Sequence, residues 1–298
     1  MLTAFLIRVL NPQKNPDFEV SETIADVLRR ACDELHIELR QADHQSRVGV
    51  ITETMRKDIR DSDVVFADAN SANENVWYEI GYADCVNLEK VICVFHEDRS
   101  LPFDRRDVRS VDYKSLDDRK FHDDLRNAIV AVLKKVVFPS LIPSGGVDSE
   151  KDAADDFVRK LPPQLCDLGV QWLLSVVRGS ETHHLTARRA AVRALDDLGG
   201  LTPDTCVELT RNTMHHSVRA AVYDQLSTSE IDVPSDVWVF HMRELREQVL
   251  IDAFAKAVSH YWLAGKLDDA TLRRWVKPGL EEPLSQVITQ ALRKASAI

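Results

Sequence analysis

Cysteine is scarce in this chain, and its thiols are scattered. None of them forms a close pair or a Cys-x-x-Cys motif. The five are Cys32, Cys85, Cys93, Cys166 and Cys206. Disulfide frameworks and zinc cages need closely spaced thiols, so neither is expected. Unpaired cysteines fit a reducing compartment, and we expect a cytoplasmic protein.

Glycine-rich and catalytic signature motifs are also missing. The 298 residues include 10 glycines, but no Gly-x-Gly-x-x-Gly, Walker loop, Gly-x-Ser-x-Gly or His-Glu-x-x-His. The pairs His183-His184 and His215-His216 are adjacent, so on a helix their side chains diverge by about 100° and do not form a metal site. They are expected at helix ends. No metal and no resident cofactor are expected, and a bound nucleotide would lack a glycine-rich phosphate cradle.

Positive charge is in deficit, with 38 Lys and Arg against 48 Asp and Glu and a formal net charge of −10. This balance disfavours a nucleic-acid polymer or an anionic membrane as the partner, and it favours a small ligand. No apolar run reaches the roughly 18 residues of a membrane span. The apolar start at residues 1–10 is interrupted by Arg8 and lacks a basic segment and a cleavage site, so it predicts a buried first strand rather than a signal peptide.

Residues 1–138 alternate short apolar runs with segments of helical periodicity, which is typical of a parallel sheet with crossover helices. Strands are predicted near 4–10, 38–42, 63–68, 90–95 and 109–112, and helices near 21–36, 49–61, 76–87 and 117–136. Five such strands predict an α/β domain with a flavodoxin-like, doubly wound parallel sheet. Ligands of this fold bind outside the carboxyl ends of the strands.

Residues 139–149 contain two prolines and a Gly pair, and they predict a linker. After it, only helical patterns are found, so residues 150–298 are predicted to form an all-α domain. The predicted helices lie near 150–160, 163–178, 185–198, 203–214, 217–227, 235–264, 268–275 and 283–296. A chain of this length is also expected to hold two domains.

The tetrapeptide Arg-Ala-Ala-Val occurs twice in the second half, at Arg189–Val192 and 30 residues later at Arg219–Val222. Small residues beside an arginine are similar to the second helices of HEAT-type repeats. A short α-solenoid of helix pairs and an irregular helical bundle both stay open as interpretations.

The most informative segment is a predicted buried strand that ends in Asp68, followed by a polar loop and a helix. The loop and helix start hold Asn70, Asn73 and Asn75. Asp68 is therefore expected at the carboxyl edge of the sheet. Glu79 is expected near the first turn of the helix, where the helix dipole would keep it ionised. Two carboxyl groups in such places suit attack on, or stabilisation of, the anomeric carbon of a ribose.

Residues 73–83 read Asn-x-Asn-Val-x-Tyr-Glu-x-Gly-Tyr-Ala. With the preceding strand, this motif resembles the nucleoside 2-deoxyribosyltransferase-like superfamily, which includes bacterial TIR-like nucleotide-binding domains. The resemblance covers residues 1–138. It implies cleavage or transfer of an N-glycosidic bond in a nucleotide or in NAD, with NAD or the nucleotide as substrate or ligand.

The resemblance also implies roles for individual residues. Glu79 matches the catalytic glutamate, and Asp68 matches an acidic position near the sugar or base. The three asparagines would line the loop that faces the ribose or phosphate, and Asp43 corresponds to an acid after the second strand. Met55 stands where the deoxyribosyltransferases carry a further carboxylate. This difference disfavours a strict deoxyribosyltransferase and favours TIR-like cleavage of NAD or a related nucleotide.

Further side chains are candidates for the same pocket. Tyr78 neighbours Glu79, Arg8 lies near the end of the first predicted strand, and Arg47 lies in the loop after the second. Trp77 is expected to pack in the core. Arg105, Arg106 and Arg109 alternate with acids and are expected on a solvated ion-pair surface.

Other interpretations stay open beside the enzymatic one. Glu79 and Asp68 can serve structure alone, as a glutamate that stabilises its helix and a cap on the following turn. The first domain can also be a nucleotide-sensing module or scaffold, with the helical domain binding a protein partner or assembling copies of the chain. The resemblance implies a homo-oligomer, and a role in bacterial antiphage immunity.

Overall fold

The computed structural model describes residues 2–9, 18–41, 53–70, 74–99, 109–142, 150–179, 185–211, 214–234, 248–268, 270–272 and 289. The chain divides into two compact units. The first comprises Met1–Ser140 with Lys160–Leu165, and the second comprises Leu141–Arg159 with Cys166–Ile298.

The first unit contains a five-stranded sheet in the order β2-β1-β3-β4-β5, and every pair of neighbouring strands is parallel. The strands are β1 (Leu2–Ile7), β2 (Ile37–Gln41), β3 (Val64–Asp68), β4 (Val91–His96) and β5 (Ser110–Tyr113). The predicted α/β fold with a doubly wound, flavodoxin-like sheet is confirmed. In this strand order the chain switches direction between β1 and β3, whose carboxyl ends flank the expected ligand crevice.

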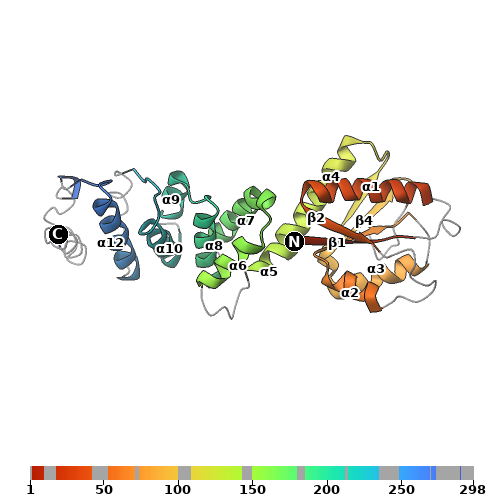
Figure 1. Cartoon of the computed structure of the whole chain (residues 1–298), viewed down its shortest axis with the longest axis horizontal. Coiled ribbons are helices and arrows are strands. Elements are labelled where there is room, and N and C mark those ends of the chain that lie inside the picture. The colour runs from red at the N-terminus through yellow and green to blue at the C-terminus, as the bar shows by residue number, and fades with distance from the viewer. Residues whose placement is uncertain are drawn as a thin grey trace. The chain divides into compact units, whose positions relative to one another are not determined.

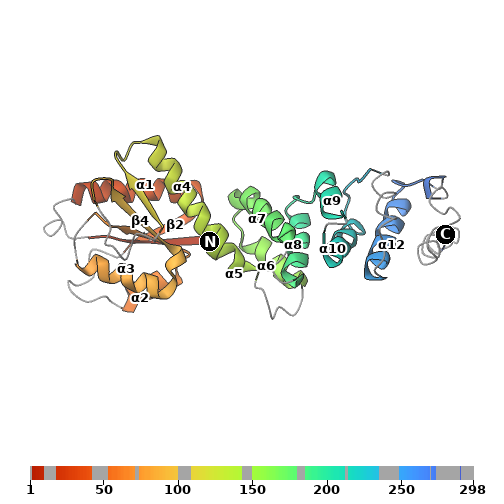
Figure 2. The same cartoon turned by 180° about the vertical axis from the view of Figure 1, so that it is seen from behind.

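Helices cover both faces of the sheet (Figures 1 and 2). One layer holds α1 (Phe18–Glu34) and α4 (Arg119–Val132), and the other holds α2 (Glu53–Asp61) and α3 (Glu74–Asn87). Alternate strand residues such as Phe5, Ile7, Val65 and Ala67 join one buried cluster with Ile80 of α3. Because strand side chains alternate between faces, the residues between them face the α1 and α4 layer.

Two polar anchors hold the amino edge of this sheet. Asp63 Oδ2 accepts a 2.8 Å hydrogen bond from the Thr3 backbone amide, which gives Asp63 a structural role directly before β3. Lys90 is buried after α3, and its Nζ donates to the carbonyl oxygens of Ile59, Arg60 and Ser62 at 2.8, 2.9 and 3.0 Å. The lysine thereby satisfies carbonyls that the carboxyl end of α2 would otherwise leave without a partner.

The helix that ends the first unit extends further than the sequence predicts. After α4 the chain makes a π-helical turn, Leu133–Val137, and then continues as α5 (Phe138–Leu141). The wider turn, in which the Phe138 amide donates to the Leu133 carbonyl, immediately precedes Pro139, which has no amide hydrogen of its own. The predicted linker is therefore wrong over residues 139–141, and its residues 143–149 lie outside the described part.

The described residues of the second unit form helices and the turns between them, and none of these residues is in a strand. Its helices are α6 (Glu150–Lys160), α7 (Cys166–Arg178), α8 (Leu185–Asp197), α9 (Pro203–Leu209), α10 (His216–Leu226) and α12 (Gln248–Leu263); the short 3-10 turn Pro163–Leu165 precedes α7. Thr202 caps α9 by accepting from the Thr205 amide, and Pro203 follows it at the first helical position. Helix α8 packs against α10 and α10 against α12, the neighbour-to-neighbour packing of stacked repeats. The predicted helix at 283–296 lies almost wholly outside the described residues.

The structural repeat has a different register from the repeated tetrapeptide. Arg188 and Arg219 are buried, whereas Arg189 is partly exposed and pairs with Glu150 at 2.9 Å. The buried positions of α8 and α10 match at an offset of 31 residues, which aligns Arg188 with Arg219. The offset of 30 between the tetrapeptides is thus one residue out of register. None of the helices within the described ranges has the length and apolar character needed to cross a membrane.

Candidate functional site

The candidate site lies at the carboxyl edge of the sheet, where β1 and β3 end side by side. Ile7 of β1 pairs with Ala67 of β3, so Arg8 and Asp68 are the next residues on the two adjacent strands. Both side chains are buried although both carry charge-bearing groups. Buried charged groups at this edge are the first sign of a site rather than of a plain sheet end.

Asp68 is held by the turn that follows β3. Its Oδ1 accepts hydrogen bonds from the Asn70 amide at 3.1 Å and from Asn70 Nδ2 at 2.8 Å. The Asn70 Oδ1 accepts in turn from the His96 amide at 2.7 Å, which connects the turn to the end of β4. The structure therefore brings Asp68 and Asn70 together, and it gives Asp68 the turn-capping contact of the structural interpretation.

Glu79 occupies a different environment from the one predicted. Helix α3 starts at Glu74, so Glu79 lies in its second turn, and 9% of the residue is exposed. Burial raises the pKa of its carboxyl group to about 7. The expectation of a first-turn glutamate kept ionised by the helix dipole is wrong, because the dipole acts mainly within the first turn and loss of hydration disfavours the charged form.

No hydrogen bond joins Glu79 to Asp68 in the described part of the chain. Burial is the cause of the raised pKa of Glu79. Side chains alternate between the two faces of β3, so Asp68 is on the same face as Val64 and Phe66. This is the face opposite the buried cluster that includes α3 residues. The convergence of the two carboxyl groups on one cleft therefore stays a prediction.

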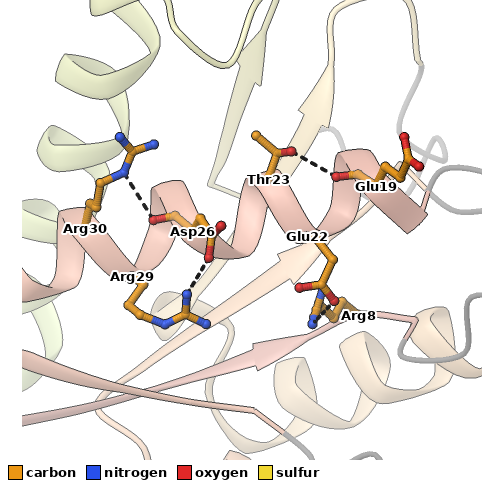
Figure 3. A network of polar contacts seen from close by, with 7 residues as sticks. All are labelled: Arg8, Glu19, Glu22, Thr23, Asp26, Arg29 and Arg30. Atoms are coloured by element: carbon orange, nitrogen blue, oxygen red, sulfur yellow. Dashed lines mark hydrogen bonds and ion pairs between the residues drawn. The ribbon is translucent and has the colours of Figure 1, made fainter.

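Arg8 is nearly sealed from solvent beside the same edge. Its side chain is 1% exposed, and its Nη2 lies 2.7 Å from Glu22 Oε1. Figure 3 shows Glu22 reaching from α1 toward Arg8 at the end of β1. Arg8 was predicted to reach the pocket, and the structure places it at the switch point, on the α1 side of the sheet.

The outer face of α3 carries a small aromatic surface. Tyr78 is 57% exposed, and its hydroxyl accepts from Arg56 Nη2 at 3.5 Å. The Arg56 guanidinium also lies 5.8 Å from the centre of the Tyr82 ring. Trp77 and Met55 pack against the buried cluster, as expected for Trp77. Arg56 was not predicted as part of this surface. Its partners, Tyr78 and Tyr82, lie on α3, and local sequence patterns do not indicate how α3 packs against α2.

The remaining predicted residues lie at the start of α3, at the opposite edge of the sheet, or outside the described part. Asn75 is exposed in the first turn of α3. Arg109 donates to the Glu89 carbonyl at 2.6 Å, at the amino edge of the sheet and away from the site. The residues that lie outside the described ranges are Asp43, Arg47, Asn73, Arg105, Arg106, His183 and His184.

His215 and His216, the histidine pair within the described residues, lie at the start of a helix, as expected. His215 caps the start of α10, where its Nδ1 accepts from the Ser217 amide, and its ring lies 4.2 Å from the ring of His216. Across the described residues, no group of three or more His, Cys, Asp or Glu side chains is arranged to hold a metal ion.

No family model, no curated protein and no solved structure matches the chain. The fold and the residues at its carboxyl edge are therefore what indicates a function for this chain.

Proposed function

We propose that the first unit binds a nucleotide or NAD at the carboxyl edge of β1 and β3 and breaks its N-glycosidic bond, with Glu79 as the catalytic carboxyl group. One observation carries the proposal: Glu79 is buried in the second turn of α3, and loss of hydration raises its pKa to about 7. Burial disfavours the charged form of a carboxyl group, and groups with a pKa shifted in this way are concentrated at functional sites.

The chemistry follows from the charge that develops on the sugar. As the bond between C1′ and the base nitrogen breaks, the base leaves with the bonding electron pair and C1′ becomes electron-poor. Ionised Glu79 attacks or stabilises this carbon, and water or a second base then bonds to C1′ and releases the carboxylate. With a pKa of about 7, Glu79 presents a substantial ionised fraction at neutral pH. Asp68, fixed by Asn70, would position the ribose.

The test is release of free base from a panel of NAD, nucleosides and nucleoside monophosphates, followed by chromatography. Glu79→Gln is expected to lower the rate by about a hundredfold or more, because the nucleophile or cation stabiliser is lost. Glu74→Gln is the matched control, since Glu74 is exposed in the first turn of the same helix. Absence of release from every compound, or undiminished release by Glu79→Gln, contradicts the proposal.

A second candidate function comes from the helical unit. The successive packing of α8, α10 and α12 is typical of repeat proteins, which present extended binding surfaces. In this alternative the first unit senses the nucleotide and the helical unit binds a protein partner or a second copy of the chain. Calorimetric binding of nucleotide without base release, together with a mass that rises with protein concentration, would favour it over the enzyme.

A further inference from the structure

We infer that Arg8 binds the phosphate group of the nucleotide, so that the ligand of this site is a nucleoside phosphate rather than a nucleoside. The inference rests on the proposed function for the place of binding, but it does not depend on Glu79 or on turnover.

The guanidinium of Arg8 is incompletely satisfied. Its Nη2 is paired with Glu22, but its Nε and Nη1 are buried and have no hydrogen-bond partner in the described structure. A buried nitrogen donor without a partner costs roughly 1–3 kcal/mol, and more when the group is charged. Two such donors on one side chain indicate that an acceptor is missing from beside Arg8.

The position of Arg8 indicates where that acceptor belongs. Arg8 directly follows β1 at the switch point, opposite Asp68 at the end of β3. Ligands of this fold bind at that point. Glu22 is 43% exposed, so the ion pair lies just beneath the surface of the carboxyl edge.

The chemistry of the group favours phosphate as the acceptor. A guanidinium offers several N–H donors in one plane and binds phosphate oxygens in pairs. The hydrogen bond from Arg8 Nη2 to Glu22 fixes the orientation of the guanidinium group before the ligand binds. The chain has no glycine-rich loop to surround a phosphate with backbone amides, and a side-chain cation would take over that role.

A nearby pair serves as the control. On α1, Arg29 and Asp26 form an ion pair whose side chains are 47% and 64% exposed (Figure 3). Water satisfies the remaining donors of Arg29, so this arginine has no need of a ligand.

The experiment compares calorimetric affinities of the full chain for a nucleoside and for its 5′-monophosphate, across a small set of bases. The unchanged protein is expected to bind the monophosphate about tenfold more tightly or better. Arg8→Gln is expected to abolish this preference and leave the affinity for the nucleoside unchanged, Arg8→Lys to keep part of it, and Arg29→Gln to keep all of it. Circular dichroism checks that each variant folds.

The outcomes separate this inference from the proposed function. Equal affinity for nucleoside and monophosphate in the unchanged protein, binding of neither, or a preference that survives Arg8→Gln overturns the inference, and the first of these needs no variant. An Arg8-dependent preference without base release supports the phosphate site while contradicting the enzyme. Base release from nucleosides without a preference for the monophosphate supports the enzyme and contradicts the phosphate site.

Discussion

Glu79 shows how the environment of one side chain decides its chemistry. The motif around it identifies the residue, but its protonation depends on which face of α3 is buried, and that is set by the sheet and by α2. The sequence led us to expect that the helix dipole would keep the pKa of Glu79 low. In the folded chain, loss of hydration raises this pKa instead. Arg8 is a similar case, because Glu22, its partner, belongs to another element.

The raised pKa of Glu79 predicts a pH-dependent stability. A carboxyl group whose pKa rises from 4.5 to about 7 on folding destabilises the folded chain increasingly as the pH rises through that interval. Glu79→Gln removes the ionisation, so the variant should gain about 3 kcal/mol relative to the unchanged protein between pH 4.5 and pH 8. Denaturant unfolding at the two pH values measures this gain.

The control for that measurement is Glu74→Gln. Glu74 is exposed in the first turn of α3. The difference in free energy of unfolding between Glu74→Gln and the unchanged protein should therefore be nearly independent of pH. A Glu79→Gln variant whose relative stability is the same at both pH values would show that folding does not raise the pKa of this carboxyl group.

At the scale of elements, Lys90 is expected to hold α2 against the sheet. Its ammonium group donates to three backbone carbonyls at the end of α2, and burial lowers its pKa. Lys90→Met leaves those carbonyls without their donor and should lower the free energy of unfolding by about 3 kcal/mol. Lys57→Met, on the exposed side of α2, should change it by less than about 0.5 kcal/mol. Equal effects of the two substitutions would contradict this role.

In the helical unit, two adjacent arginines distinguish the structural register from the tetrapeptide register. Arg188 is buried and donates from Nη2 and Nε to the Val177 carbonyl near the end of α7, at 2.6 and 3.1 Å. Arg188→Leu should destabilise the unit by about 2–3 kcal/mol. Arg189→Leu, which removes a partly exposed pair, should cost less than about 1 kcal/mol. Thermal unfolding compares the two, and a larger loss from Arg189→Leu would favour the tetrapeptide register.

Much of the element order could be read from the sequence. The buried strands β3 and β4 are largely apolar runs, and each of their predicted ends lies within one residue of the observed one. The first strand was extended too far, because Arg8 and Val9 are buried without being paired in the sheet. Pro139 was taken as a helix end because local rules cannot foresee that a π-helical turn precedes it.

At the scale of the whole molecule, the fold explains why one edge of the first unit collects charged side chains. In parallel sheets with crossover helices every strand ends at the same edge, and the change of direction between β1 and β3 opens that edge. Arg8, Asp68 and the start of α3 all lie there because of chain order alone. The sequence could place the acids at this edge, but it could not give the face on which each side chain lies.

The most direct test of the account is the rate of base release as a function of pH, measured with the nucleotide or NAD that the panel identifies. The account predicts that the rate rises with pH through an apparent pKa near 7, matching the pH range in which Glu79→Gln gains stability, and that Glu79→Gln retains about one hundredth of the activity or less. Base release that is undiminished in Glu79→Gln, with the same pH profile, would contradict it.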